Sequence, residues 1–349
     1  MVRAMVRLGG LLLVVACSKP PAQQGQADAP DPPLQDASID GPLTMLDCYH
    51  HLFPFFMSSE LDYDQFSPTI NSECAGTNHQ QIDGIQRVVF LGDSVTTGSP
   101  PTPTNDFYRS RLADFLVTRF GLQAPDTLWK SVNPLTGQAA TQESGDFASC
   151  AKWGARADDL MRDKTQVEDC MPESTRGKHT LVIMTVGGND ISKIAQAGGE
   201  GASTEEVWQM AHDSIDLTRQ AIDWMRTPGR FPNGIDIVFN TMHEYTDGTG
   251  DTSSCLVASQ AYKPWANPQV LRDIVLWMNE QHVKMAVETR TDLVFLLENF
   301  CGHGFHNDDP ASPCYRGPNT SRWLDATCIH PNPEGHGELA KLFEKVISE

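Results

Sequence analysis

The stretch that decides the fold is Val88-Val89-Phe90-Leu91-Gly92-Asp93-Ser94. Its first four residues are apolar, and a run of this kind is typical of a strand buried on both faces in the middle of a parallel sheet. In open α/β sheets the chemistry lies just past the carboxyl ends of such strands, so Ser94 stands where a nucleophile is presented. Gly-Asp-Ser is also an ordinary turn and helix-capping sequence. The rest of the chain has to decide between these interpretations.

The chain beyond this stretch alternates between short apolar runs and amphipathic segments. We expect further strands at residues 128–132, 181–186, 235–239 and 293–297. We expect helices at residues 107–120, 158–170, 203–226 and 267–289, and a last helix from Pro333 onward. Strands that alternate with helices predict βαβ units. The expected fold class is therefore α/β, as a three-layer α/β/α domain with a central, mainly parallel sheet flanked by helices.

The N-terminal segment has a composition of its own. Residues 1–16 combine two arginines with a short apolar run, which is typical of a signal peptide and too short for a permanent transmembrane helix. The next residue, Cys17, ends a stretch that resembles the lipobox of bacterial lipoproteins, so we expect Cys17 to be lipidated. An ordinary signal peptide with a chance cysteine is the alternative. Residues 17–44 are rich in Pro, Gln, Ala and Asp, which predicts a disordered tether.

The rest of the chain divides into two parts. Residues 45–85 form an aromatic, cysteine-containing extension, and residues 86–349 form the α/β domain. We expect the extension to be stapled onto the domain, with a substrate-facing flap as the alternative. The signal peptide and Cys17 predict an exported protein of the cell envelope, held on a bacterial membrane only by its N-terminal lipid. We also expect the protein to be a monomer.

Nine cysteines occur, and eight remain once Cys17 is set aside. An even number in an exported chain predicts up to four disulfides, although the sequence does not determine how they pair. Proximity along the chain suggests the pairs Cys48–Cys74, Cys150–Cys170, Cys255–Cys301 and Cys314–Cys328. No two cysteines have the C-x-x-C spacing, which argues against a zinc ribbon or a thioredoxin-like redox site.

The formal net charge is −19. Nucleic-acid affinity is built on the neutralisation of phosphates by cationic side chains. A surface this acidic repels polyanions, so we expect no nucleic-acid partner.

Three further blocks lie in loops: one follows the predicted strand at 181–186, one lies in the loop between that block and Gly92-Asp93-Ser94, and one comes just before the last helix. They are Gly154, the run Gly187-Gly188-Asn189-Asp190, and the run His330-Pro331-Asn332. A serine that cleaves esters needs a base in hydrogen-bond reach and donors aimed at the developing oxyanion. The backbone N–H groups of Ser94 and Gly154 and the side-chain amide of Asn189 are suitable donors. Loops past the strand ends of a doubly wound sheet open on one edge, so these blocks are expected to meet.

Together with Gly92-Asp93-Ser94, the blocks resemble the SGNH (GDSL) hydrolase family, whose four motifs they match in order over about residues 86–349. The resemblance implies a flavodoxin-like fold and metal-free hydrolysis of carboxylic esters through an acyl-enzyme, without a cofactor. It implies that Ser94 is the nucleophile and His330 the general base. Ser94, Gly154 and Asn189 would form the oxyanion hole. The other common serine-hydrolase motif, Gly-x-Ser-x-Gly, is not satisfied, because Thr96 stands at its second glycine.

One position departs from the family. Its acid usually stands three residues before the histidine, where this chain has Thr327. Asp325 is the nearest carboxylate, and we expect it to be the third catalytic residue if the loop around Cys328 lets it reach the imidazole ring. In the alternative, a backbone carbonyl near Thr327 orients His330 and the site is a dyad.

Other polar residues near these motifs have simpler interpretations. We expect Asp93 and Asp190 to brace their loops rather than react, and His336 to be a packing or capping residue. A group of His and Asp residues superficially suggests a metal site, but it lacks a ligand spacing, so we expect surface polarity there: His303, His306, Asp308 and Asp309.

Two functions compete at this point. The favoured one is an envelope esterase or lipase acting on a small-molecule, lipid or acylated-carbohydrate ester. The alternative is a catalytically silent binding lipoprotein that keeps the fold. Specificity is expected to lie in the extension and in three loops, at residues 99–104, 242–266 and 298–324.

Overall fold

A computed structural model of the chain describes residues 42–162, 165–261 and 263–349. The expected signal peptide, Cys17 and nearly all of the expected tether lie outside these residues. The extension at 45–85 and the domain at 86–349 belong to one compact unit.

A six-stranded sheet runs through this unit in the order β4-β5-β1-β6-β7-β8. Every neighbouring pair is parallel except β4 and β5, which are antiparallel. The predicted mainly parallel sheet is thereby confirmed. The strands are β1 (Arg87–Gly92), β4 (Glu143–Ser144), β5 (Phe147–Ser149), β6 (Thr180–Thr185), β7 (Ile235–Asn240) and β8 (Asp292–Val294). A separate two-stranded sheet pairs β2 (Val132–Asn133) with β3 (Gln138–Ala139).

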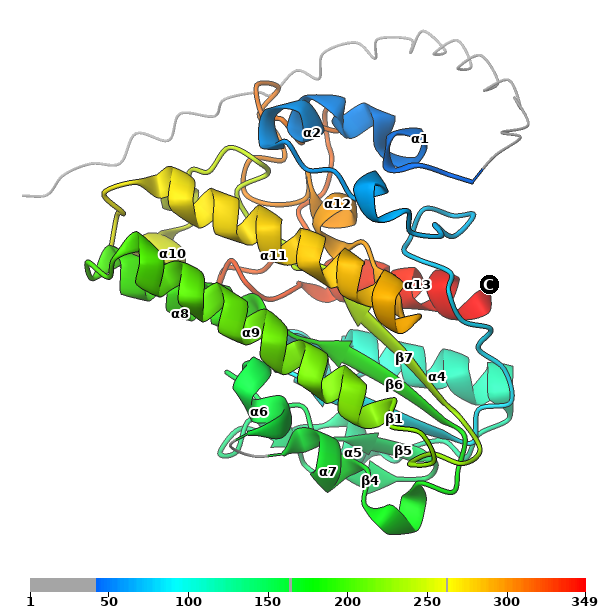
Figure 1. Cartoon of the computed structure of the whole chain (residues 1–349). Coiled ribbons are helices and arrows are strands. Elements are labelled where there is room, and N and C mark those ends of the chain that lie inside the picture. Colours follow the sequence, from blue (N-terminus) through cyan, green and yellow to red (C-terminus); the bar gives the residue numbers. More distant parts are fainter. Residues whose placement is uncertain (1–41, 163–164, 262) are drawn as a thin grey trace, which may run out of the picture. The chain divides into compact units, whose positions relative to one another are not determined.

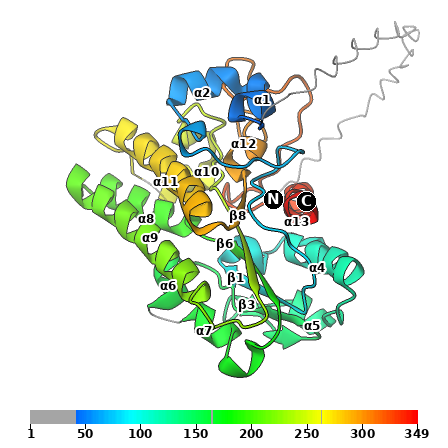
Figure 2. The same ribbon diagram turned by 45° about the vertical axis from the view of Figure 1, so that its right-hand side comes forward.

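Helices cover both faces of the large sheet, which gives the three layers (Figures 1 and 2). Alternate residues of β1 belong to different cores, because successive strand side chains point to opposite faces. Val89 packs with the helices α6 (Ala157–Met161), α8 (Gly188–Gly199), α9 (Thr204–Met225) and α11 (Pro268–Thr289). Phe90 packs with α4 (Tyr108–Phe120) and α13 (Pro333–Ser348). All six residues of β1 and of β6 are buried, as expected for strands covered on both sides.

Several predicted elements need correction. Residues 127–130 form a helix, α5 (Thr127–Lys130), instead of the start of a strand, because the Asp126 carboxylate accepts the N–H of Trp129 and caps it. The strand expected at 293–297 ends at Val294, and α12 (Leu296–Phe300) follows. The helix expected at 158–170 is two short helices, α6 and α7 (Gln166–Cys170). Helix α8 and strand β5 were not predicted.

The other helices are short. They are α1 (Met45–Tyr49), α2 (Phe53–Ser59), α3 (Ser94–Thr97) and α10 (Leu256–Ala261), with 3-10 turns at His50–Leu52, Asp64–Phe66, Thr104–Asp106, Glu173–Thr175 and Thr252–Ser254. Within the described part of the chain, no helix is long and apolar enough to cross a membrane.

The aromatic extension packs into the core beside the end of β8. The rings of Tyr49 and Tyr63 both contact Phe295, and the ring of Tyr63 stacks on it at a centroid distance of 5.9 Å. The disulfide Cys48–Cys74 links two residues within the extension. The ring contacts with Phe295, and not this disulfide, join the extension to the rest of the unit.

The described residues contain four disulfides, and two of them were predicted correctly, Cys48–Cys74 and Cys150–Cys170. The expected pairs Cys255–Cys301 and Cys314–Cys328 are wrong. The bonds are Cys255–Cys328 and Cys301–Cys314. Proximity along the chain misled here, because the loop after β7 meets the loop before α13, which is 73 residues away.

Candidate active site

Ser94 is the first residue of α3, directly past the carboxyl end of β1. The chain leaves the strand at Gly92, whose φ of +112° is a conformation that favours glycine. Gly92 also lies so close to the carbonyl of Thr185 that a Cβ would collide with it. Asp93 then caps α3, because its Oδ1 accepts the N–H of Val95 at 2.9 Å. The strand, the glycine and the cap together fix the turn that presents Ser94.

Asp93 braces this turn, as expected. Its Oδ1 also accepts the hydroxyl of Thr185 at 2.9 Å, which joins the ends of β1 and β6. Burial raises the pKa of Asp93 to about 6, and the hydrogen bonds that it accepts oppose the rise. The hydrogen bonds of the Asp93 carboxylate thus hold the turn together.

His330 lies against the candidate nucleophile. Its Nε2 is 2.8 Å from the Oγ of Ser94, although the two residues are 236 positions apart. Burial lowers the pKa of His330 below its usual value, and the negative charge of Asp325 acts in the opposite direction. A neutral imidazole of this kind can take a proton from a hydroxyl at neutral pH.

Asp325 and His330 are linked through Thr327. The Oγ1 of Thr327 is 3.0 Å from the Nδ1 of His330, and the same hydroxyl donates to the Oδ1 of Asp325 at 2.5 Å. The Oδ1 of Asp325 also accepts the backbone N–H of Thr327 at 2.8 Å. The carboxylate of Asp325 is therefore linked to the ring of His330 through one intervening hydroxyl group. The sequence suggested only direct contact or a backbone carbonyl, and the role of the hydroxyl was missed.

The loop that carries these three residues is closed on itself and tied to its surroundings. Leu324 pairs with Pro331 in an antiparallel bridge, and the N–H of Asp325 donates to the carbonyl of His330 at 2.9 Å. The disulfide Cys255–Cys328 ties the loop to the segment after β7. The Nε2 of His243 lies 2.9 Å from the carbonyl oxygen of Ile329, and burial lowers the pKa of His243 to about 4, so it stays neutral and donates.

The register of the sheet brings the other two loops to Ser94. The N–H of Lys152 donates to the carbonyl of Gly92 at 3.0 Å, so these two residues lie side by side. Ser94 lies two residues past Gly92, and Gly154 lies two residues past Lys152. Gly92 is also the register partner of Thr185, from which the chain continues to Asn189. The side-chain amide of Asn189 donates to the carbonyl of Ala155 at 2.9 Å, which joins α8 to the Gly154 loop.

The family model of the GDSL-like lipase/acylhydrolases matches residues 88–343. The chain belongs to this family. Hydrolysis of ester bonds is accordingly its general activity.

Solved structures of partly similar shape are found at low sequence identity and with TM-scores below 0.5. One is a gut microbial diltiazem-metabolizing enzyme, with 17% identity and a TM-score of 0.44; the match covers 78% of this chain and 49% of that one, so the chain spans about half its length. Phospholipase A1 from Streptomyces albidoflavus NA297 has 14% identity and a TM-score of 0.42, with 74% and 98% covered. A lipolytic protein of the G-D-S-L family from Veillonella parvula DSM 2008 has 14% identity and a TM-score of 0.40, with 76% and 99% covered. No curated protein sequence matches the chain.

Two more residues of this GDSL hydrolase behave as the sequence predicts. Asp190 braces its loop, because its carboxylate accepts the N–H of Ala157 at 3.1 Å, and burial raises its pKa to about 7. His336 is a packing residue. Its ring stacks on Tyr108, whose N–H donates to its Nδ1 at 3.2 Å, and burial lowers its pKa to about 3.

The His and Asp residues near position 306 are engaged with their neighbours. His303 stacks on Trp323 at a centroid distance of 3.4 Å, and His306 lies 3.3 Å from a carboxylate oxygen of Asp251. Asp309 lies 3.9 Å from the same histidine. Among the residues that the structure describes, no group of three or more His, Cys, Asp or Glu side chains could hold a metal ion.

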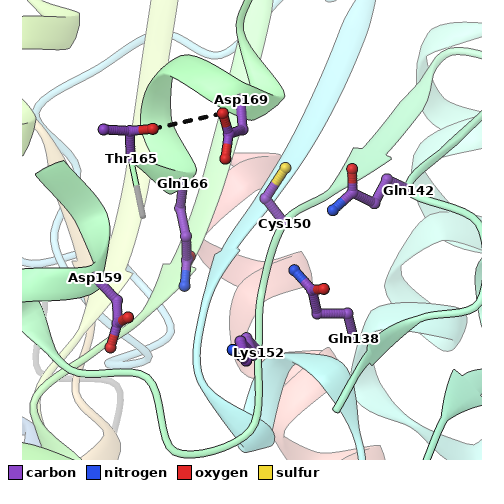
Figure 3. A pocket seen from close by; sticks show the side chains of 8 residues that line it. All are labelled: Gln138, Gln142, Cys150, Lys152, Asp159, Thr165, Gln166 and Asp169. Atoms are coloured by element: carbon purple, nitrogen blue, oxygen red, sulfur yellow. Dashed lines mark hydrogen bonds between the residues drawn. The ribbon is translucent and has the colours of Figure 1, made fainter. Parts of the chain in front are cut away.

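A polar cavity of about 360 Å³ lies beside Cys150, the residue that follows β5, and Figure 3 shows the side chains that line it. Gln166 connects it to the turn that presents Ser94, because its side chain accepts the N–H of Gly92 at 2.8 Å and donates to the carbonyl of Gly92 at 3.1 Å. The cavity is lined by Gln138, Gln142, Cys150, Lys152, Asp159, Thr165, Gln166 and Asp169. Ser94 and His330 are not among these residues, so the cavity is a neighbour of the candidate site and not its floor.

Proposed function

We propose that this GDSL hydrolase cleaves carboxylic esters with Ser94 as nucleophile and His330 as general base, through an acyl-enzyme. The observation that carries the proposal is the 2.8 Å contact between the Oγ of Ser94 and the Nε2 of His330. A nucleophile and a base within hydrogen-bond reach, with the base oriented by a third group, are the signature of activated-serine chemistry.

In the proposed reaction, the Oγ of Ser94 bonds to the ester carbonyl carbon while its proton passes to the Nε2 of His330. The resulting imidazolium returns that proton to the alcohol oxygen as the carbon–oxygen bond breaks, which leaves an acyl-enzyme. A water molecule then attacks the acyl carbon and gives a proton to Nε2. Release of the acid returns that proton to the Oγ of Ser94, so the enzyme is regenerated and water is consumed.

We assign the oxyanion hole to the N–H groups of Ser94 and Gly154 and to the amide of Asn189. The first N–H groups of a helix have no acceptor within it, and Ser94 opens α3. Gly154 has a φ of +73°, and a Cβ there would meet nothing within 4 Å. The backbone conformation, and not a lack of space for a side chain, therefore favours glycine at this position. The bond from Asn189 to Ala155 supports a common position for the three donors.

The substrate is proposed to be a lipid ester, an acylated carbohydrate or a small-molecule ester, selected by the loops at 99–104, 242–266 and 298–324. Three exposed apolar side chains adjoin, along the chain, His330 or the disulfide that fastens its loop, and we propose that they supply a surface for an acyl chain. Ile329 precedes His330, and Leu256 and Val257 follow Cys255, which is bonded to Cys328. Leu256 is 70% exposed, so its side chain is free to cover a bound ligand. We call Leu256, Val257 and Ile329 the apolar rim.

The protein is proposed to act in the cell envelope as a monomer, lipid-anchored through Cys17. Four disulfides within the described residues support an oxidising compartment, since such bonds persist in exported proteins and are rare in the cytosol. Labelling of the expressed protein with a radioactive fatty acid, compared with Cys17→Ala, tests the anchor.

The activity is tested with p-nitrophenyl acetate, butyrate and octanoate and with a fluorophosphonate probe. We expect the purified protein to hydrolyse at least one of these esters and the probe to label Ser94. Both signals should disappear in Ser94→Ala, and labelling should be lost in His330→Ala. A protein that neither hydrolyses nor is labelled would support the silent binding function instead.

A further inference from the structure

Thr327 joins the carboxylate of Asp325 and the imidazole ring of His330, which share no direct hydrogen bond or ion pair in the described structure. Its Oγ1 is within hydrogen-bond distance of the Nδ1 of His330, at 3.0 Å, and of the Oδ1 of Asp325, at 2.5 Å. The side chain and the backbone of Thr327 donate to the same carboxylate oxygen, because the backbone N–H of Thr327 also bonds to the Oδ1 of Asp325. The hydroxyl is therefore held from one side by Asp325 while it faces His330 on the other.

The direction of the hydrogen bonds follows from what each group can do. An ionised carboxylate only accepts, and a hydroxyl has one proton to donate and two lone pairs. The proton of the Thr327 hydroxyl is consumed by Asp325, so Oγ1 can only accept from the ring of His330. The ring proton is thereby placed on Nδ1, and Nε2 keeps the lone pair that must accept the proton of Ser94.

The second lone pair of the hydroxyl is also used. The backbone N–H of His330 lies 3.3 Å from the Oγ1 of Thr327 and points its proton at it. One donated and two accepted hydrogen bonds fill the capacity of a hydroxyl. Thr327 is consequently fixed by its own backbone, by Asp325 and by His330, all within six residues of chain. A hydroxyl in such a fixed position can hold an imidazole in one orientation.

We propose that Thr327 is a positioning residue whose hydroxyl transmits the orienting effect of Asp325 to His330 and selects the imidazole tautomer that can accept from Ser94. This inference rests on the proposed function. It replaces the direct acid–histidine hydrogen bond with an acid–hydroxyl–histidine relay, in which the hydrogen bonding of the Asp325 carboxylate reaches the imidazole only through Thr327.

A double-mutant cycle tests the relay. Thr327→Val removes the hydroxyl and keeps the branched shape, and we expect it to lower kcat by about 10²-fold with KM nearly unchanged, because loss of the tautomer-fixing partner affects the transition state and not binding. Asp325→Asn should lower kcat to a similar extent. If Asp325 acts through the hydroxyl, the double variant should lose about as much as either single variant, since the two changes break the same chain.

Two conservative variants supply the rescue. Thr327→Ser keeps the hydroxyl and should stay within about threefold of the original kcat. The pair Thr327→Asp with Asp325→Asn puts a carboxylate directly at the position next to His330 and should recover most of the activity that Thr327→Val loses. A merely structural role for Thr327 gives no reason for that recovery.

Two results would overturn the relay: a Thr327→Val variant with unchanged kcat, or a double variant whose loss equals the product of the two single losses. Thermal midpoints of all variants show whether each one is folded, and the Thr327→Asp pair decides the matter if the valine variant unfolds. Failure of the proposed function is distinguishable, because it would appear in the unmodified protein and in Ser94→Ala, before any change at Thr327.

Discussion

The Oγ1 of Thr327 lies 3.0 Å from the Nδ1 of His330, on the side of the imidazole ring opposite the contact with Ser94. The Thr327 side chain therefore occupies the place next to the proposed base, and the carboxylate of Asp325 lies one hydrogen bond further away. A negative charge at that distance still acts on the imidazole, because part of the loop is buried and the effective dielectric constant is below that of water.

The first prediction concerns the pH dependence of Asp325→Asn. The proposed base must be neutral, so kcat/KM rises with pH through the pKa of His330, which burial places below its usual value. The charge of Asp325 raises that pKa, and its removal should move the acidic limb of the profile to lower pH while the plateau falls. Measurement of kcat/KM for p-nitrophenyl butyrate between pH 4 and 8 checks this. An unshifted limb would show that Asp325 does not act on the titrating group.

The second prediction concerns the disulfide Cys255–Cys328, which fastens the loop that carries Asp325, Thr327 and His330 and is called the relay loop below. We expect kcat of the double variant Cys255→Ser with Cys328→Ser to fall about tenfold, because the loop no longer holds Thr327 and His330 in a fixed position relative to Ser94. Loop-closure entropy predicts a fall in stability of about 4 kcal/mol at most for this loop of 73 residues.

The pair Cys48–Cys74 is the matched control for that experiment. It closes a loop of 26 residues in the extension, so its removal should lower stability by nearly as much, since the dependence on loop length is logarithmic. Its kcat, measured on the folded variant, should be unchanged. Equal losses of kcat in both double variants would mean that general destabilisation, and not the relay loop, explains the effect.

The part of the site that could be predicted from the sequence is the part that depends on strand ends. The apolar run at 88–91 and that at 181–186 are buried strands, and their parallel register carries Ser94 and Asn189 to one edge. The start of α8 was not predicted, because Gly187-Gly188-Asn189-Asp190 is rich in residues that favour turns. Strand β5 has three residues, too few for a hydrophobic pattern to be recognised.

What could not be predicted depends on contacts between distant loops or on the direction of one hydroxyl. Cys255 pairs with Cys328 because the loops after β7 and before α13 meet, and spacing along the chain carries no information on that. The turn at Asp325 is partly foreseeable, since Asp commonly accepts the N–H two residues on, as it does from Thr327. That the same Thr side chain also faces His330 follows only from the closed loop.

The third prediction concerns Glu298, a buried carboxyl group outside the proposed site. Burial raises its pKa to about 7, and Arg316 donates to its backbone carbonyl, at 2.8 Å. The folded protein thus holds a proton there that the unfolded chain releases near the ordinary glutamate pKa of 4.5, so the contribution of Glu298 to stability falls as pH rises from about 4.5 to 7. Glu298→Gln should therefore be more stable than the unmodified protein at pH 8, by about 1–3 kcal/mol, and little different at pH 4.5.

Urea unfolding at several pH values measures this difference. Asp93 and Asp190 are also buried with raised pKa values, but they are present in both proteins and cancel in the comparison. The exposed Glu173 supplies a control, because Glu173→Gln makes the same exchange at the surface and should not reproduce the stabilisation at pH 8. A constant difference between Glu298→Gln and the unmodified protein from pH 4.5 to 8 would contradict the prediction.

The last prediction concerns the apolar rim and the acyl chain. Leu256 and Ile329 are 70% and 43% exposed, and the disulfide Cys255–Cys328 keeps their segments together beside His330. An acyl chain of about eight carbons can cover these side chains, whereas an acetyl group is too short to do so. Apolar burial is worth roughly 25 cal/mol per Å², so partial contact with two side chains corresponds to about a tenfold effect. The variant Leu256→Ser with Ile329→Ser should lower kcat/KM for p-nitrophenyl octanoate by about that factor and leave the acetate nearly unaffected. Leu128→Ser, on the similarly exposed Leu128 of α5, should change neither value. An equal loss on both esters would instead assign the effect to a disturbed His330 loop, and no loss on either would remove the apolar rim from substrate binding.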